Sequence, residues 1–199
     1  MKNFFDKQVE KFKKQSIVSK ILDIIFVVLI ILIIIPATRK EVMTYASKLR
    51  MYITSVNTSS DRIEVSNDNN LEFIDEKGEQ YTFADFSGKP VFINYWATWC
   101  PPCRAEMPAL EKLYKEYKGD INFLFISQES FSKTGKFIKD HDYELPVYRL
   151  VSAPQQPLDY EVLPTTMFIA EGKLIFNKDG AVNWNSDKIK QILNEHIEK

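Results

Sequence analysis

The junction that carries both cysteines of this chain constrains its fold more than any other feature. Residues 91–96, VFINYW, are β-branched, aromatic or apolar apart from one asparagine, and predict a strand buried on both faces. Cys100 and Cys103 follow with two prolines between them. Apolar residues then recur at helical spacing up to Gly119: Met107, Leu110, Leu113, Tyr114 and Tyr117. The pattern predicts a buried strand that leads directly into an amphipathic helix, with the dithiol at the junction.

The rest of the C-terminal two thirds alternates between strand and helix patterns. Strands are predicted on both sides of a turn at 76–78, and then at 121–127, 146–150, 165–170 and 173–180. Helices are predicted at 130–142 and 187–198, and Glu171-Gly172 is the expected turn of the final hairpin. Strands that alternate with helices predict an α/β fold with a mixed sheet.

An apolar segment near the N-terminus predicts a membrane anchor. Residues 21–35 are apolar except for Asp23, and extension back to residue 17 gives a helix of about 28 Å, close to the thickness of a bilayer core. Lysines are more numerous before this segment than basic residues just after it, which predicts a cytoplasmic N-terminus. The alternative is a cleaved signal peptide, because the uninterrupted core at 24–35 also suits an h-region.

These patterns predict four parts in the chain: a cytoplasmic basic tail at 1–16, a transmembrane anchor at 17–36, a stem and linker at 37–67, and a folded domain at 68–199. The net charge of −1 and the lack of a basic strip interleaved with aromatic residues argue against nucleic-acid binding.

The two cysteines do not suit a structural role. A disulfide that closes so short a loop stabilises a fold by only roughly 2 kcal/mol. A structural zinc site needs about four protein ligands, and the chain offers only His141 and His196 beside the cysteine pair, neither in a metal-binding motif. No metal site is therefore predicted.

A reactive dithiol fits the junction better. At a helix N-terminus the sulfur of Cys100 meets unpaired N–H groups and the positive end of the helix dipole, and both favour the nucleophilic thiolate. Cys103 is placed to attack a mixed disulfide formed on Cys100. Pro101 and Pro102 supply no N–H, so they limit how many donors can stabilise the thiolate.

The segment VFINYWATWCPPCRAEMPAL, with VLPTTMFIA and EGKLI downstream, resembles the thioredoxin superfamily, and specifically the membrane-anchored TlpA/ResA-like thiol-disulfide oxidoreductases of bacteria. The resemblance implies a thioredoxin-like three-layer sandwich with a central mixed sheet, preceded by one N-terminal transmembrane helix. It also implies an exposed attacking Cys100, a resolving Cys103, a cis-proline at Pro164 that faces the dithiol, and a helix kink at Pro108. Glu106 matches an acidic residue that the ResA-like branch places close to the cysteines.

One position departs from the pattern of thioredoxin itself. Asn94 stands where thioredoxin has a buried aspartate that takes the proton of the resolving cysteine, and an amide cannot do this. Glu106 lies three residues beyond Cys103 on the same helical face, so we hypothesise that it accepts this proton, directly or through water. The alternative is an ordinary solvated glutamate.

The remaining expectations concern the surroundings of the dithiol. Trp96 is predicted to pack in the core, and Trp99, Pro101 and Leu163 are predicted to contribute to the substrate-binding surface. No cofactor is expected beyond the redox-active Cys100–Cys103 disulfide.

The resemblance implies an extracytoplasmic enzyme on a single-pass anchor in the cytoplasmic membrane, with its catalytic domain periplasmic or otherwise outside the cytoplasm. We expect it to reduce disulfides of partner proteins, with apocytochrome c as a candidate target and a membrane electron donor of the DsbD/CcdA type. The alternatives are a disulfide-forming oxidant and a copper-carrying binding protein. A peroxidase is less favoured, because Thr98 lies at the wrong spacing for a Thr-x-x-Cys site.

Overall fold

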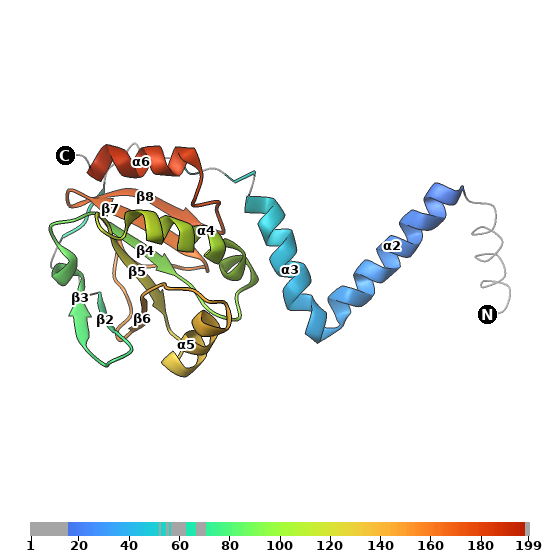
Figure 1. Cartoon of the computed structure of the whole chain (residues 1–199), viewed down its shortest axis with the longest axis horizontal. Helices are drawn as coiled ribbons and strands as arrows, with labels where there is room; N and C mark the ends of the chain where they lie inside the picture. Colours follow the sequence, from blue (N-terminus) through green and yellow to red (C-terminus); the bar gives the residue numbers. More distant parts are fainter. Residues whose placement is uncertain (1–15, 52, 55, 57–62, 67–70, 198–199) are drawn as a thin grey trace. The chain divides into compact units, whose positions relative to one another are not determined.

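The computed structural model describes residues 16–51, 53–54, 56, 63–66 and 71–197 (Figure 1). The chain divides into two compact units, residues 1–42 and 43–199. The predicted basic tail lies outside the described residues except for Ser16.

Helix α2 (Ile17–Ile34) occupies most of the predicted membrane anchor. Ser16 caps it by accepting a hydrogen bond from the Ser19 N–H at 3.2 Å. The predicted continuous segment at 17–36 is interrupted at Ile35, which is extended (φ −73°, ψ 117°), because a residue before proline disfavours helical backbone. Helix α3 (Pro36–Met51) then begins with the proline in its first turn. Among the described residues, no helix combines the length and apolar character that a membrane crossing requires.

An eight-stranded mixed sheet forms the centre of the second unit, in the order β1-β8-β7-β4-β5-β6-β2-β3. Strand β4 pairs in parallel with β5, and β5 with β6, whereas the other neighbours are antiparallel. The strands are β1 (Ile63–Glu64), β2 (Glu72–Ile74), β3 (Gln80–Thr82), β4 (Val91–Tyr95), β5 (Asn122–Ser127), β6 (Val147–Leu150), β7 (Thr165–Ala170) and β8 (Lys173–Asp179). The predicted α/β fold with a mixed sheet is confirmed.

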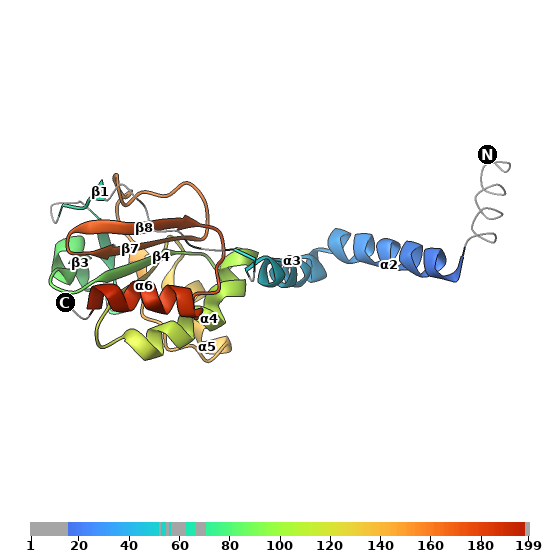
Figure 2. The same ribbon diagram turned by 90° about the horizontal axis from the view of Figure 1, so that it is seen from above.

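Side chains of β4 alternate between the two faces of the sheet. Phe92 enters the core cluster that also contains buried residues of the helices α4 (Pro101–Tyr117), α5 (Phe131–Asp140) and α6 (Asp187–Ile197). Figure 2 shows these three helices on one side of the strands. Ile93 belongs to the cluster on the opposite face. That face is covered by Phe83 of the short 3₁₀ helix η1 (Phe83–Phe86) and by loop residues such as Leu158. Among the described residues, no α-helix contributes to the buried cluster on this face.

Helix α4 begins at the residue that the sequence indicates. Cys100 is its N-cap, and Pro101 and Pro102 fill the first two positions, where a missing N–H breaks no helical hydrogen bond. The helix continues through Pro108, whose ring is exposed. Met107, Leu110 and other buried residues pack the helix against the sheet, so it continues although the proline supplies no N–H.

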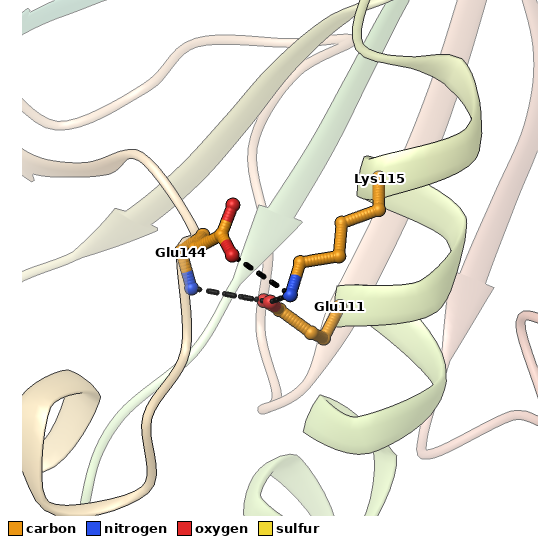
Figure 3. Close-up of polar contacts among 3 residues, drawn as sticks. All are labelled: Glu111, Lys115 and Glu144. Carbon is orange, nitrogen blue, oxygen red and sulfur yellow. Dashed lines mark hydrogen bonds and ion pairs between the residues drawn. The ribbon is translucent and has the colours of Figure 1, made fainter.

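A polar contact ties α4 to the segment that leads into β6 (Figure 3). The main-chain N–H of Glu144 donates to both carboxylate oxygens of Glu111, at 3.2 and 3.1 Å. Lys115 lies 2.8 Å from Glu111 and 2.9 Å from the Glu144 carboxylate. The three residues hold the middle of α4 beside the entry to β6.

The sheet includes residues that the sequence assigns to the linker. Ile63 and Glu64 form β1 beside β8, and the N–H of Val65 donates to the carbonyl of Gly172 at 2.8 Å. A two-residue strand has too few positions for a period of two to be recognised. The expected turn at Glu171-Gly172 is present, with positive φ at both residues (53° and 69°), as hairpin turns of this length require.

Candidate active site

The dithiol lies where the buried strand β4 ends and α4 begins. Cys100 and Cys103 form a disulfide with an S–S distance of 2.14 Å and a Cα–Cα distance of 5.3 Å. The N–H of Cys103 donates to Cys100 Sγ at 3.2 Å. Because Pro101 and Pro102 have no N–H, this is the first donor that the helix can offer to the sulfur.

Cys100 is less exposed than predicted. Its relative exposure is 2%, and that of Cys103 is 0%. Cys100 nevertheless lines a pocket of about 450 Å³, whereas Cys103 does not. The expectation of an exposed attacking cysteine is therefore corrected: Cys100 is buried, and it lines the wall of this pocket.

The pocket contains the three residues predicted for substrate binding, Trp99, Pro101 and Leu163. Trp99 is 58% exposed although it is large and apolar, which suits a contact surface. Trp96 is buried as predicted, and it reaches the pocket wall. The other residues that line the pocket are Ala97, Cys100, Pro102, Gln128, Glu129, Tyr160, Glu161 and Val162.

Glu129 is a residue of the pocket that the sequence reasoning missed. Its carboxylate accepts hydrogen bonds from the Thr98 N–H at 2.6 Å and the Thr98 hydroxyl at 3.0 Å. The contact holds the segment that presents Cys100 against the end of β5. The carboxyl ends of adjacent parallel strands meet at one edge of a sheet, and this rule could have identified Glu129.

Pro164 immediately precedes β7 and is buried, and the Leu163–Pro164 peptide bond is cis. The bond Gln156–Pro157 is also cis, which the sequence reasoning did not anticipate.

Glu106 is fully buried, so the alternative of a solvated glutamate is wrong. Three groups donate hydrogen bonds to its carboxylate. Asn94 Nδ2 donates to Oε1 at 2.9 Å. The indole Nε1 of Trp184 donates to Oε2 at 2.7 Å, and the N–H of Val182 donates to the same oxygen at 3.2 Å. Cys103 lies one helical turn before Glu106 and is also fully buried.

Burial raises the pKa of Glu106 to about 8, although the hydrogen bonds from Trp184, Asn94 and Val182 each act to lower it. The pKa of an ordinary thiol is about 8.5. The raised pKa of Glu106 is therefore close to that of an ordinary thiol, which suits a carboxyl group for proton exchange with one.

Asn94 joins this cluster to the sheet. Asn94 and Thr166 are direct partners in the register of β4 and β7, and Asn94 Nδ2 donates to Thr166 Oγ1 at 2.8 Å. The amide oxygen Oδ1 of Asn94 is buried without a hydrogen-bond partner. The contribution of Trp184 and Val182 was missed, because the segment between β8 and α6 has no periodic pattern that would place it.

The two histidines lie away from the dithiol pocket. His141 Nδ1 is 2.8 Å from the carbonyl oxygen of Phe137 at the end of α5, and His196 packs near Phe168. Neither lines the pocket that contains Cys100. In the part of the chain that the structure describes, no group of three or more His, Cys, Asp and Glu side chains could hold a metal ion.

Comparison with known proteins places this site in a family. The AhpC/TSA family matches residues 64–185, which is more than half of the chain. The chain is 31% identical over 134 residues to the thiol-disulfide oxidoreductase ResA of Bacillus cereus, a match that covers 65% of this chain and 74% of ResA. It is 38% identical over 104 residues to the thioredoxin-like protein YneN of Bacillus subtilis, covering 49% of this chain and 60% of that protein.

A solved structure has the same fold. The thiol:disulfide interchange protein of the thioredoxin family from Chlorobium tepidum aligns with a TM-score of 0.53 at 21% identity, over 69% of this chain and 99% of that one. The expected resemblance to thioredoxin-like oxidoreductases is confirmed. The chain belongs to the AhpC/TSA family and is a thioredoxin-like thiol-disulfide oxidoreductase, similar to the ResA proteins.

Proposed function

We propose that this oxidoreductase is a protein-disulfide reductase, which passes electrons from reduced Cys100 and Cys103 to disulfides of partner proteins. The observation that supports this direction is the small number of donors available to a thiolate on Cys100. Among the described residues, only the Cys103 N–H donates a hydrogen bond to its sulfur. A strong disulfide-forming oxidant is one whose reduced form is stabilised, and a poorly stabilised thiolate favours the opposite direction.

The exchange takes place in two steps. The Cys100 thiolate attacks a substrate disulfide, forms a mixed disulfide with one sulfur and releases the other as a thiolate. Cys103 loses its proton and attacks Cys100 Sγ, so the Cys100–Cys103 bond forms and the mixed disulfide breaks. The substrate leaves with two added electrons as two thiolates, which take protons from solvent.

Glu106 accepts the proton of Cys103 in the second step. This role is supported by the burial of both side chains, their separation by one helical turn, and the pKa of about 8 for Glu106. The neutral Asn94 cannot take the proton, which leaves Glu106 as the acid-base group of this buried cluster.

Glu106→Gln tests this role. We expect the rate of the second step to rise with pH up to about 8 in the unmodified protein, and to lose this component in the variant, because glutamine takes up no proton. Stopped-flow measurement of exchange with a disulfide peptide between pH 5 and pH 10 provides the rates. Glu116→Gln, on the exposed face of the same helix, is the matched control. An unchanged profile in Glu106→Gln would rule out the role.

The proposed setting is the outer face of the cytoplasmic membrane, with residues 17–36 as the anchor. Its support is the exposed apolar surface of α2, where Ile24, Ile25, Phe26 and Val27 are each more than half exposed. Cytoplasmic thioredoxin cannot reach an enzyme there, so the electrons come from a membrane donor of the DsbD/CcdA type. Apocytochrome c is the proposed target, by resemblance to the ResA-like branch.

Membrane attachment and orientation are tested in cells. Full-length protein should remain with membranes after alkaline extraction, and protease added to spheroplasts should remove the catalytic domain. Recovery in the soluble fraction, or protection from the protease, would contradict the proposed setting without affecting the exchange chemistry.

A redox titration against glutathione tests the direction. We expect a potential far below the roughly −120 mV of a strong disulfide-forming oxidant, and a value near it would make the chain an oxidant instead. Cys103→Ala should trap mixed disulfides on Cys100 in cells, and the double variant Cys100→Ala, Cys103→Ala is the control. Capture of an apocytochrome c would support the proposed target, and failure to trap any protein would count against exchange itself.

A further inference from the structure

Trp184 contacts Glu106 although it lies far along the chain from the two cysteines, outside the segment that carries them. It lies between β8 and α6, is fully buried, and donates its indole N–H to Glu106 Oε2 at 2.7 Å. The indole packs against two phenylalanine rings, Phe92 at 5.3 Å and Phe176 at 5.9 Å between ring centroids. These contacts fix the ring, so its N–H has a defined direction.

The donors are distributed unequally over the two oxygens of Glu106. A carboxylate offers about four lone-pair sites, about two on each oxygen. Oε2 accepts from both the Trp184 indole and the Val182 N–H, whereas Oε1 accepts only from Asn94. Indole and peptide nitrogens donate but do not accept, so a proton on Oε2 would have to displace one of them. The free site lies on Oε1.

We propose that Trp184 is a positioning residue for the proton transfer: with the Val182 N–H it occupies Oε2, so that Oε1 is the oxygen that takes the proton of Cys103. This inference rests on the proposed role of Glu106 and adds to it which oxygen reacts. In the step, the S–H bond of Cys103 breaks and an O–H bond forms at Oε1. The electron pair left on Cys103 Sγ then forms the bond to Cys100 Sγ, while the bond from Cys100 to the substrate sulfur breaks and the substrate leaves as a thiolate.

The surroundings of Glu106 make the effect measurable. From β4 it faces Asn94, from the segment after β8 it faces Val182 and Trp184, and one turn earlier on its own helix lies Cys103, held in the disulfide. Thr166 of β7 is linked to it only through Asn94. The causes that shift the pKa of Glu106 are burial and these three donors, and no charged side chain of the described residues is among them.

Trp184→Phe tests the proposal in the oxidised full-length protein, where the cysteines do not titrate. The carboxyl carbon of Glu106 is followed by ¹³C NMR in protein labelled on glutamate, with Glu106→Gln to assign the signal. Loss of one donor to the ionised form should raise the titration midpoint by about one pH unit. Phe176→Leu disturbs the same aromatic cluster without removing a donor, and should leave the midpoint in place.

Exchange kinetics provide the second measurement. The pH dependence of the second step should move upward with the midpoint in Trp184→Phe, so that the rate at pH 7 falls about tenfold. If Glu106→Gln changes the profile but Trp184→Phe shifts neither the midpoint nor the profile, the inference about Trp184 is wrong and the proposed role of Glu106 stands. If Glu106→Gln has no effect on the profile, the role of Glu106 fails first.

A chemical substitution covers the case in which Trp184→Phe does not fold. β-(3-Benzothienyl)alanine incorporated at position 184 keeps the shape of the indole but replaces its N–H by sulfur. The same rise in the midpoint is expected, and an unchanged midpoint would overturn the proposal.

Discussion

Glu106 keeps its proton at pH values where an exposed glutamate has lost it, because no water reaches its carboxylate and three donors only partly replace hydration. Glu106 is thus mostly protonated at neutral pH, and only its ionised fraction can accept a proton. Asn94 is compatible with a protonated Glu106, because the NH₂ group of an amide donates hydrogen bonds and its oxygen accepts them. The amide oxygen Oδ1 of Asn94 is buried without a hydrogen-bond partner, so this acceptor is still available.

The buried acid predicts how stability depends on pH. The pKa of Glu106 is about 8 in the folded protein and about 4.5 when the chain is unfolded, so the folded state binds the extra proton between these values. The stabilisation from this bound proton is complete below the pKa of the unfolded chain. It is lost as the pH rises through the pKa of the folded protein. We expect the free energy of unfolding to fall by up to about 1.4 kcal/mol per pH unit in this interval.

Denaturant unfolding of the oxidised protein at pH 5, 6, 7 and 8 measures this slope, and Glu106→Gln should lack this component. If the two proteins showed parallel dependence on pH, the carboxyl of Glu106 would titrate as an ordinary glutamate.

For single residues, the sequence predicted which side chains take part in the chemistry better than it predicted their burial and hydrogen-bond partners. Cys100 and Cys103 were identified from residue type and spacing. Glu106 was identified from the resemblance to the ResA-like branch together with its place three residues after Cys103, on the same helical face. The hydrogen bond from Trp184 to Glu106 was not predictable, since it joins residues far apart in the chain. Glu129 was within reach of the rule on the ends of adjacent parallel strands, but its hydrogen bonds to Thr98 have no local sequence signal. The burial of Cys100 was missed for the same reason.

Among the helices and strands, α4 carries the dithiol in its first turn. Glu111 fixes the middle of this helix to the segment before β6 (Figure 3). Glu111 is largely buried, and both of its oxygens accept from one main-chain N–H. The contact therefore links the helix that carries the cysteines to the neighbouring strand.

Removal of this contact should loosen α4. We expect Glu111→Ala to lower the free energy of unfolding by about 1–2 kcal/mol, because the N–H of Glu144 is left without its acceptor. Lys136→Ala removes a pair with Asp140 that is exposed on both sides, and is expected to have little effect. Equal stability of the two variants in chemical denaturation would show that Glu111 contributes only as a surface charge.

The helices and strands of the domain were predictable to within a few residues, because their hydrophobic periods are clear. Strand β4 and helix α4 are the best examples, with continuous burial in the first and helical spacing of buried residues in the second. The short elements β1 and η1 were missed, since a strand of two residues and a single 3₁₀ turn have no period.

For the molecule as a whole, residues before the predicted domain start at residue 68 contact the sheet. Strand β1 pairs with β8, and the buried Val65 that follows it donates its N–H to the carbonyl of Gly172. The order of the strands depends on pairings such as that of Phe73 with Leu150, which no local pattern specifies. Fold class was thus predictable from alternation of strands and helices, whereas the edges of the sheet were not.

Two substitutions, one in β1 and one just after it, test this boundary. Val65→Ala should lower the free energy of unfolding by about 2 kcal/mol, because Val65 is 4% exposed. Ile63→Ala, at a half-exposed position of the strand itself, should cost much less. Thermal or denaturant unfolding measures both, and a Val65→Ala variant as stable as the unmodified protein would place the domain boundary after this residue.

The two edges of the sheet are β1, with two residues, and β3, with three. Long exposed edges recruit extended polypeptides by strand addition, and this is a common origin of aggregation. Within the part of the chain that the structure describes, either edge therefore offers an extended polypeptide only a few unpaired backbone groups.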